Sequence, residues 1–400
     1  MRCEWQVKKL SDIVEFNPTE RLPKGAIAKK ISMDMLQPFT KDIFQYELQP
    51  YNGGAKFRNG DTIMARITPC LENGKVSKVN ILTQGEVGFG STEYIVLRAI
   101  PNVSDPDFIY YLTISDLVRA PAIKSMVGSS GRQRVQQNVL ETLELPIPPY
   151  DEQKKIATIL SALDEKIAIN REINDNLQQQ LRTIFKAEFT DNPELENITQ
   201  IPLSELCHVV TKGTTPTTLG KPFVESGINF IKAESILDDH SIDKSKFAFI
   251  DEETNALLKR SIIHAGDVVF TIAGTLGRFA LIDENVLPAN TNQAVAIIRA
   301  DVEKVLPEYI YTCFIGEWHT DYYAKRVQQA VQANLSLTTI KSLPIPLLDK
   351  AKMSEYLSLI LPLIKAIKTN EAQNEKLAAL RDNLLPKLMS GEIDVSDVQL

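Results

Sequence analysis

The chain has 400 residues, of which 44% are hydrophobic and 24% charged; these ordinary fractions exclude a collagen-like, mucin-like or wholly disordered protein. With 44 Lys and Arg against 51 Asp and Glu, the formal charge is -7. This excludes a polycation that wraps a phosphate backbone along its whole length but allows a local basic face. The four cysteines form no CxxC pair, which is typical of reduced thiols in the cytosol. No apolar signal segment opens the sequence, and the longest apolar stretch, 357–367, is about half a membrane span. We expect a soluble, cytoplasmic protein without a membrane partner.

The sequence repeats one plan with a period of about 200 residues. Five short segments recur in the same order, with offsets from 193 to 206 residues. They are Leu10–Ile13 with Leu203–Leu206, Gly60–Ile63 with Gly266–Val269, Tyr94–Arg98 with Val295–Arg299, Asp107–Tyr110 with Glu308–Tyr311, and Leu145–Pro148 with Leu343–Pro346. Between these segments the two copies diverge almost completely. The pattern predicts two domains that share a frame and differ in what they contact.

A long segment almost free of Gly and Pro follows each copy of Leu-Pro-Ile-Pro, and it predicts a helix after each domain. Asp151 and Asp349 are the expected N-caps. Apolar and Asn residues then alternate in steps of three and four, which is a heptad seam. The seam residues are Leu160, Leu163, Ile167, Asn170, Asn174, Leu177, Leu181 and Ile184 in the first helix, and Ile360, Leu363, Ile367, Asn370, Asn374, Leu377, Arg381 and Leu384 in the second.

Asn occupies the same two seam positions in both helices: Asn170 and Asn174, then Asn370 and Asn374. Antiparallel and parallel pairing would both superpose these layers, so the orientation rests on the domain plan, which predicts antiparallel helices. Asn buried in such a seam lowers stability but fixes register. The alternative is a polar interruption of a surface helix.

The architecture resembles the specificity subunits of type I restriction-modification enzymes over the whole chain. In the second copy, Lys212–Pro216 is similar to a Gly-x-x-Pro turn of that family, from which the first copy departs with Phe16–Thr19. The segments Gly60–Lys75 and Gly266–Gly277 resemble two varieties of its recognition domains. Leu145–Pro149 followed by Glu152 and Gln153 is similar to the start of its central helix, and the second copy keeps the prolines but has Lys350 and Ala351 instead.

The resemblance implies an α+β fold with two target recognition domains, built on twisted, partly barrel-like sheets and separated by a pair of long antiparallel coiled-coil helices. The implied boundaries are 1–150 for the first domain, 151–190 for the central helix, 191–348 for the second domain and 349–400 for the C-terminal helix. It further implies a non-catalytic subunit that recognises an asymmetric bipartite target in double-stranded DNA. Two methyltransferase subunits and the restriction subunits would be its partners, and S-adenosylmethionine, ATP and Mg would be bound by those partners and not by this chain.

Base recognition needs Arg, Lys, Asn, Gln, Ser and Thr on loops. By segment, residues 1–150 carry +2, 151–200 carry -4, 201–350 carry -4 and 351–400 carry -1. The acidic second domain is the main objection to DNA binding, but its acids cluster at 238–239 and 251–253. The candidate DNA-binding residues are Arg66, Thr68, Lys75, Arg132 and Arg134 in the first copy, and Thr214, Thr215, Thr271, Thr275, Arg278, Lys325 and Arg326 in the second. Structural turns and plain phosphate contacts are the alternatives for each.

Two other functions remain open from the residues alone. A free-standing methyltransferase or nuclease would need a cofactor or metal motif, and Asn17-Pro18 and Asn192-Pro193 lack the second proline and the aromatic residue of a base-flipping methyltransferase loop. A structural coiled-coil adaptor with protein-binding ends would need no DNA-reading side chains. Exchanging the first domain separates that adaptor from a specificity subunit, because only the latter changes its DNA target.

Overall fold

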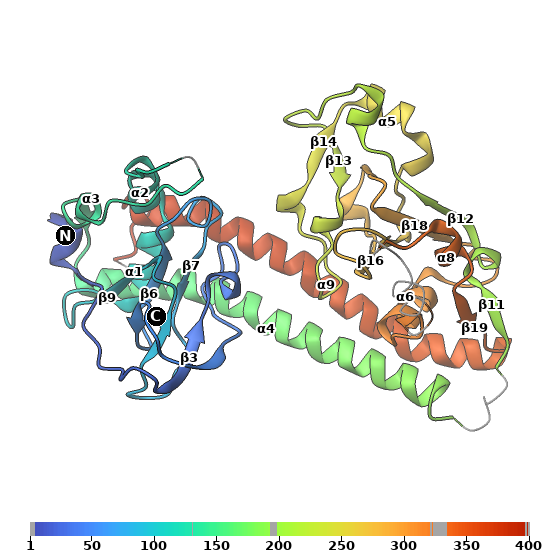
Figure 1. Cartoon of the computed structure of the whole chain (residues 1–400), viewed down its shortest axis with the longest axis horizontal. Coiled ribbons are helices and arrows are strands. Elements are labelled where there is room, and N and C mark those ends of the chain that lie inside the picture. Colours follow the sequence, from blue (N-terminus) through green and yellow to red (C-terminus); the bar gives the residue numbers. More distant parts are fainter. Residues whose placement is uncertain are drawn as a thin grey trace. The chain divides into compact units, whose positions relative to one another are not determined.

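The structure, a computed structural model, describes residues 5–129, 131–192, 198–320, 322, 334–396 and 398. It divides into two compact units, which take in parts of both long helices (Figure 1). Unit 1 is Met1–Ile169 with Gln373–Leu400, and unit 2 is Asn170–Ala372. Each unit combines sheets with helices, as predicted.

Unit 1 contains a four-stranded sheet in the order β2-β9-β6-β7, whose pairs are all antiparallel. A second sheet has the order β4-β3-β8-β5, in which β3 and β8 are parallel. The first sheet is β2 (Val14–Phe16), β9 (Tyr94–Ala99), β6 (Thr62–Ala65) and β7 (Val76–Lys78); the second is β4 (Glu47–Pro50), β3 (Ile27–Ile31), β8 (Gly88–Gly90) and β5 (Lys56–Phe57). The helices are α1 (Pro106–Ile114), α2 (Asp116–Lys124) and α3 (Gln137–Glu141), and a 3-10 turn, η2 (Met33–Met35), follows β3.

Unit 2 repeats this topology. Its four-stranded sheet has the order β12-β18-β15-β16, and β13 and β17 form the parallel pair of a three-stranded sheet, β14-β13-β17. These strands are β12 (Cys207–Lys212), β18 (Val295–Ala300), β15 (Val268–Thr271), β16 (Phe279–Leu281), β14 (Ala248–Ile250), β13 (Ile228–Ile231) and β17 (Ala289–Thr291). The helices α5 (Glu252–Leu257), α6 (Pro307–Ile315) and α8 (Leu337–Lys341) lie in this unit, and η6 (Ala233–Ser235) follows β13. The duplicated order of strands confirms the repeat predicted from the sequence.

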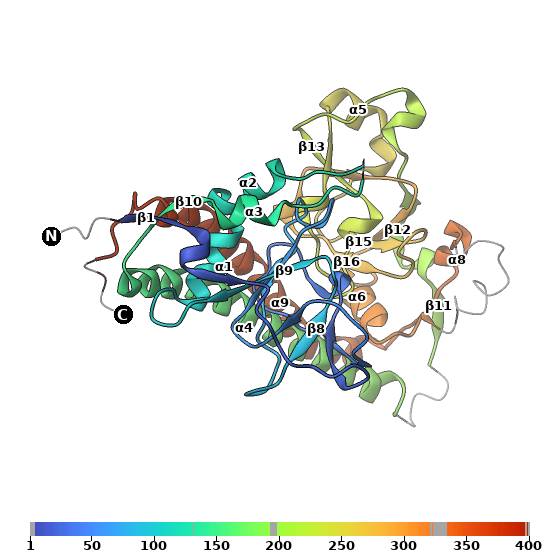
Figure 2. The same ribbon diagram turned by 60° about the vertical axis from the view of Figure 1, so that its left-hand side comes forward.

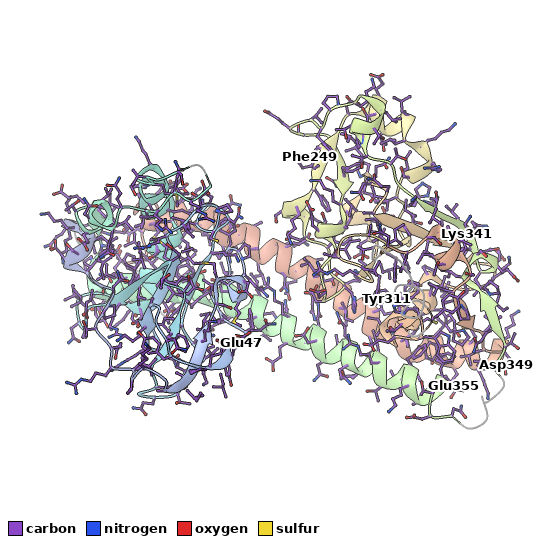
Figure 3. The ribbon with its side chains drawn as sticks, in the orientation of Figure 1. Glu47, Phe249, Tyr311, Lys341, Asp349 and Glu355 are labelled. Carbon is purple, nitrogen blue, oxygen red and sulfur yellow. The ribbon has the colours of Figure 1, made fainter. Side chains whose placement is uncertain are left out.

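The central strand of each domain is apolar on both faces because it divides two cores. In β9, Ile95 and Leu97 pack in the core that contains α1, whereas Tyr94 and Val96 pack in the core of the second sheet. The same alternation divides β18 between two cores of unit 2. Tyr311 of α6, labelled in Figure 3, is 1% exposed and lies in the core of unit 2 that contains Ala296 and Ile298 of β18. This explains why these strands read as unbroken apolar runs.

A buried Asp–Arg pair accounts for two of the repeated segments. Asp61 accepts two hydrogen bonds from the guanidinium of Arg98, both 2.7 Å, and Asp267 accepts the same two bonds from Arg299, also 2.7 Å. Each Asp also accepts a backbone N–H three residues earlier in its own turn. Such bidentate, charge-assisted pairs are strong and directional. The pair therefore ties the Gly-Asp turn to the central strand in both domains.

The two ends of each domain meet at the start of a long helix. In unit 1, β1 (Gln6–Lys9) pairs antiparallel with β10 (Glu144–Ile147), as Figure 2 shows. In unit 2, β11 (Gln200–Pro202) pairs antiparallel with β19 (Pro344–Pro346). The long helices α4 (Tyr150–Phe189) and α9 (Lys350–Met389) follow β10 and β19 within three residues.

The N-cap prediction holds for one helix only. Asp349 accepts the backbone N–H groups of Ala351 and Lys352, both at 3.0 Å, and caps α9. In contrast, α4 begins at Tyr150, and Asp151 lies inside its first turn. Pro149 precedes α4, and its backbone carbonyl accepts the N–H groups of Glu152 and Gln153, both at 2.9 Å. An acidic residue in a first turn still favours the positive end of the helix dipole. At the other end, α9 stops at Met389, short of the predicted range.

The helices run antiparallel within each unit. In unit 2, the Phe189 ring lies 5.3 Å from that of Tyr356, and Asn174 donates to the carbonyl of Ile367 at 3.2 Å. Residues further along α4 therefore contact residues earlier in α9. In unit 1, Asp164 of α4 pairs with Arg381 of α9 at 2.7 Å. The predicted antiparallel pair is confirmed.

Three predicted seam residues of α4 are less buried than the residues that follow them. Leu163, Leu177 and Ile184 are half-buried, and their neighbours Asp164, Gln178 and Phe185 are buried. The reason is that α4 packs against its domains as well as against α9. Asp164 accepts the Tyr111 hydroxyl at 2.6 Å, and Gln178 donates to the Asp239 carbonyl at 2.7 Å. Polar side chains with such partners can occupy buried positions that the heptad pattern assigned to leucine.

Candidate nucleic-acid interface

Two predicted arginines of the first domain meet at one carboxylate. Glu93, just before β9, accepts Arg134 through Nε and Nη2 at 2.7 to 3.0 Å. Arg66, just after β6, donates from Nε to the same carboxylate at 3.2 Å. The two guanidiniums bring together segments that lie about 70 residues apart in the sequence. We call Arg66, Glu93 and Arg134 the arginine clamp.

The backbone around the arginine clamp is fixed by its own hydrogen bonds. The N–H of Arg66 donates to the carbonyl of Glu93 at 2.9 Å, and the carbonyl of Arg66 accepts the N–H of Val135 at 2.8 Å. Val127 and Arg134 exchange both backbone bonds, which closes the loop between them. The loop holds Gly128 and Gly131 at positive φ, 138° and 78°, a conformation that suits glycine.

The electrostatics of the arginine clamp favour ionised side chains. The hydrogen bonds from Arg134, together with those from Arg66, hold the pKa of Glu93 below its usual value against the opposing effect of burial. Both arginine side chains stay partly exposed, 35% for Arg66 and 45% for Arg134. The cluster therefore keeps one net positive charge at the surface. Arg132 lies exposed on the same loop, and the Thr68 N–H donates to the Gln133 carbonyl at 3.0 Å.

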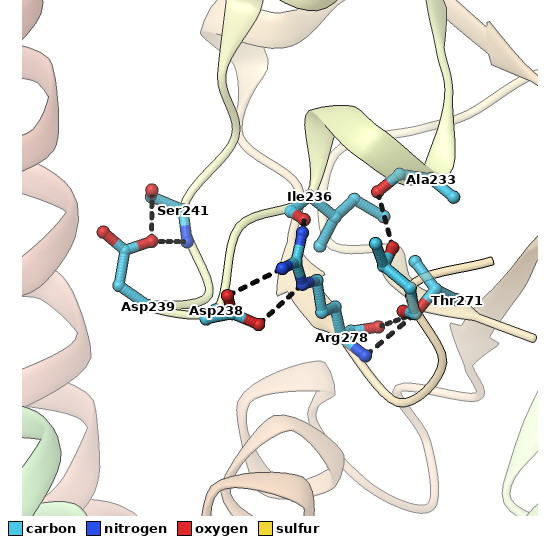
Figure 4. Close-up of polar contacts among 8 residues, drawn as sticks. Ala233, Ile236, Asp238, Asp239, Ser241, Thr271 and Arg278 are labelled. Carbon is cyan, nitrogen blue, oxygen red and sulfur yellow. Dashed lines mark hydrogen bonds and ion pairs between the residues drawn. The ribbon is translucent and has the colours of Figure 1, made fainter. Parts of the chain in front are cut away.

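Lys75 and Arg278 occupy the same place in the two domains, just before β7 and β16. Lys75 donates to the carbonyl of Met33 at 2.7 Å, and Arg278 donates from Nη1 to the carbonyl of Ile236 at 3.2 Å. Each cation thus binds the turn after β3 or β13. Asp238 also pairs with Arg278 at 2.6 and 2.7 Å (Figure 4). Both cations are half-buried, so they brace turns while leaving part of the charge at the surface.

Thr271 and Thr275 stabilise the turn between β15 and β16. Thr271 is fully buried, and its hydroxyl accepts the Arg278 N–H at 2.8 Å and donates to the Thr275 carbonyl (Figure 4). The Thr275 hydroxyl donates to the Ala233 carbonyl at 3.2 Å. These hydroxyls are used inside the domain, and Thr271 presents none of its donors at the surface.

Thr214 and Thr215 form a second polar cluster after β12. Gln293 accepts the backbone N–H of Thr215 at 3.2 Å and its hydroxyl as well. Arg260 donates to the Thr214 hydroxyl at 3.3 Å. Gly213 precedes them, and a Cβ there would lie 1.9 Å from the Thr291 carbonyl oxygen, so only glycine fits. The first domain differs here: Asn17 at positive φ ends β2 after three residues, and its side chain continues the pairing with Val96.

The predicted residues on the long helices also meet. Asn370 donates to the Asn174 side chain at 2.8 Å within unit 2. Asn174 is 8% exposed and Asn170 is fully buried, whereas Asn370 and Asn374 are half-buried. Lys325 and Arg326 lie outside the described residues.

Comparison with known proteins identifies the family. Residues 3–179 and 196–379 match the family described as type I restriction modification DNA specificity domain. The chain belongs to this family. It is 23% identical to the type I restriction enzyme MjaIX specificity subunit of Methanocaldococcus jannaschii, over 99% of this chain and 95% of that protein. The HindI specificity subunit of Haemophilus influenzae is 24% identical over 88% of this chain and 86% of its own length. The crystal structure of a type I restriction-modification S subunit from M. genitalium shares the fold, with a TM-score of 0.55 at 16% identity over 97% of this chain and 96% of that one.

The chain is thus a type I specificity subunit with two target recognition domains, as the two matched ranges show. Among the residues that the structure describes, no cluster of three His, Cys, Asp or Glu side chains could hold a metal ion. No helix in the same described part is long and apolar enough to cross a bilayer.

Three polar residues of these clusters were not predicted from the sequence: Glu93, Arg260 and Gln293. Glu93 and Gln293 lie one and two residues before the repeated central strands, so the signal for them was their place beside a repeated segment. Arg260 carries no comparable signal, because its partner Thr214 lies 46 residues away. Pairs this distant emerge only from the fold.

Proposed function

We propose that each target recognition domain reads one half of an asymmetric, bipartite target in double-stranded DNA. The observation that most supports this is that the two domains share their backbone fold but differ in the polar side chains at their surfaces. The two domains share strand order and the buried Asp–Arg pair, but the arginine clamp of one and the threonine–glutamine cluster of the other present different donors and acceptors. Different hydrogen-bonding groups select different base edges.

The proposed DNA contacts are divided by whether a predicted side chain is already hydrogen-bonded to a turn of its own domain. Arg66, Arg132, Arg134, Thr214 and Thr215 carry surface donors or acceptors and contact DNA directly. A second group braces the turns beside them and adds charge or shape: Thr68, Lys75, Thr271, Thr275 and Arg278. Lys325 and Arg326 remain predicted contacts in the second domain.

The long helices are the proposed docking surface for two methyltransferase subunits and, through them, the restriction subunits. The support for this docking role is the match of the chain to the family of specificity domains; both helices also carry exposed apolar side chains, such as Ile169 on α4 and Leu359 on α9, which are 50% and 53% exposed. The chain itself is proposed to be non-catalytic and to work in the cytoplasm. S-adenosylmethionine, ATP and Mg would be bound by its partners.

The test is to express the chain with its methyltransferase subunits and to map methylated adenines across the host genome. We expect one bipartite motif that disappears without the chain, and salt-dependent DNA binding by the complex. Exchanging residues 1–150 for another such domain should change one half of the motif. An unchanged motif would favour the coiled-coil adaptor instead, and methyl transfer by the isolated chain would contradict the non-catalytic assignment.

A further inference from the structure

The arginine clamp is not needed to build the domain, because the second domain forms the same frame without it. Ile272 takes the place of Arg66, and its N–H donates to the Ala294 carbonyl at 2.8 Å, where Arg66 donates to Glu93. The Ile272 carbonyl accepts the Leu335 N–H at 2.9 Å, where Arg66 accepts Val135. The backbone hydrogen bonds are the same in both domains. In the second domain, however, the positions of the three charged residues are occupied by Ile272, Ala294 and Asn334.

This internal comparison separates folding from recognition. Two arginines and a glutamate at a half-exposed site stabilise a domain by little, because solvent screens the attraction within exposed ion pairs. Fixing three long side chains also has an entropic cost. Their arrangement therefore calls for an explanation other than stability.

The geometry leaves a defined set of donors free. Arg66 uses only Nε on Glu93, and Arg134 uses Nε and Nη2. Among the described residues, Nη1 and Nη2 of Arg66 and Nη1 of Arg134 have no hydrogen-bond partner. The Arg134 guanidinium is held along its Nε–Nη2 edge and presents its other edge in a defined plane, and that fork matches two acceptors side by side.

We infer that the arginine clamp reads guanine in the half-site of the first domain, with Arg66 and Arg134 donating to O6 and N7 in the major groove and Glu93 acting as the positioning residue. Of the base edges in the major groove, guanine presents the two adjacent acceptors that suit an arginine fork. Phosphate offers acceptors too, but the nearby carboxylate repels it and lowers the net charge of the cluster from two to one. A fixed orientation serves base reading more than charge attraction. This inference rests on the proposed function.

The main test transplants the side chains of the second domain into the first: Arg66→Ile, Glu93→Ala and Arg134→Asn together, in the complex with the methyltransferase subunits. Because the frame forms with these residues in unit 2, the variant should fold and assemble. Methylation mapping and selection from a randomised DNA library should show that the preference for guanine falls by about ten- to a hundredfold at one or two adjacent positions of one half-site. The other half-site should stay unchanged.

Single variants keep the inference testable if the triple variant does not assemble. Glu93→Gln should relax the same guanine position, since the guanidiniums lose their charged anchor. Glu86→Gln is the matched control, because Glu86 is another half-buried acid of this domain held by a cation, Lys29 at 3.1 Å; its motif should equal that of the wild type. Arg66→Lys keeps the charge but not the fork, so it should also lose guanine preference.

Three outcomes would overturn the inference. The first is an unchanged motif in the triple variant or in Glu93→Gln. The second is a uniform weakening of binding to all DNA without a change of base preference, which indicates a phosphate contact. The third is a change confined to the other half-site. If the wild-type complex shows no bipartite motif at all, the proposed function fails, and that result is distinct from these.

Discussion

Acid should destabilise unit 2 through two buried histidines, His240 and His319. They are 9% and 3% exposed, and both lie in an aromatic cluster: His240 stacks on Phe279 at 4.0 Å between ring centroids, and His319 lies 4.9 Å from Phe314. Burial is the main cause that lowers the pKa of each from 6.5 to about 4. Both are therefore neutral in the folded protein at neutral pH.

The sign and size of the effect follow from these values. The unfolded chain binds more protons than the folded one between about pH 6.5 and about pH 4. The contribution of the two histidines to the free energy of unfolding is therefore complete above this window and is lost as the pH falls through it. At about pH 5, each histidine should cost about 2 kcal/mol relative to neutral pH, or about 4 kcal/mol for the pair.

The measurement is urea unfolding of the full chain at about pH 7.5 and about pH 5. The protein has 2 tryptophans, so a Trp5→Phe background leaves Trp318, which packs beside Phe185 in unit 2, as the fluorescent reporter. His240→Phe with His319→Phe should remove most of the pH-dependent loss, whatever its effect at neutral pH. His264→Gln, at an exposed position, is the control. If the double variant loses as much stability on acidification as the wild type, the reasoning is refuted.

Two further predictions concern the long helices. Arg381→Met should lower the free energy of unfolding by about 3 to 5 kcal/mol, because it leaves the carboxylate of Asp164 buried without its counter-ion; both side chains of this pair are under 10% exposed. The measurement is urea unfolding with Trp5 as reporter. Adding Asp164→Leu should recover much of the loss, and no recovery would contradict a buried-charge penalty. Asn174→Leu with Asn370→Leu should raise the thermal unfolding midpoint but loosen the register. Out-of-register disulfide cross-linking between cysteines introduced on α4 and α9 would reveal this slippage, and its absence would show that the Asn pair does not set the register.

The duplicated plan and the antiparallel helices were predictable because they rest on patterns that survive without side-chain detail. Repeated short segments mark the frame, and the missing Gly and Pro mark the helices. The Asn pair was predictable for the same reason, since it breaks a regular seam at matching positions, and Asn174 and Asn370 do bond to each other.

Side-chain roles were less predictable because they depend on distant partners. Thr271 and Arg278 read as surface donors in the sequence, yet Thr271 is buried in its turn and Arg278 is bound by Asp238 from 40 residues away. The burial of Asp164 in place of Leu163 has the same origin, because Tyr111 and Arg381 supply its hydrogen bonds. A heptad pattern describes one helix partner and omits the domain on the other side.

The pairing of β1 with β10, and of β11 with β19, means that the chain leaves each domain beside the point where it enters. Inserted or deleted loop residues inside a domain therefore shift neither the strand pair nor the first turn of the helix behind it. The two copies already differ in this way: Gly60 follows Leu10 by 50 residues, whereas Gly266 follows Leu203 by 63. A lineage of such proteins can lengthen or shorten the loops inside a domain without moving the start of the helix behind it, whereas an exchanged domain must still supply the partners of helix residues such as Asp164 and Gln178.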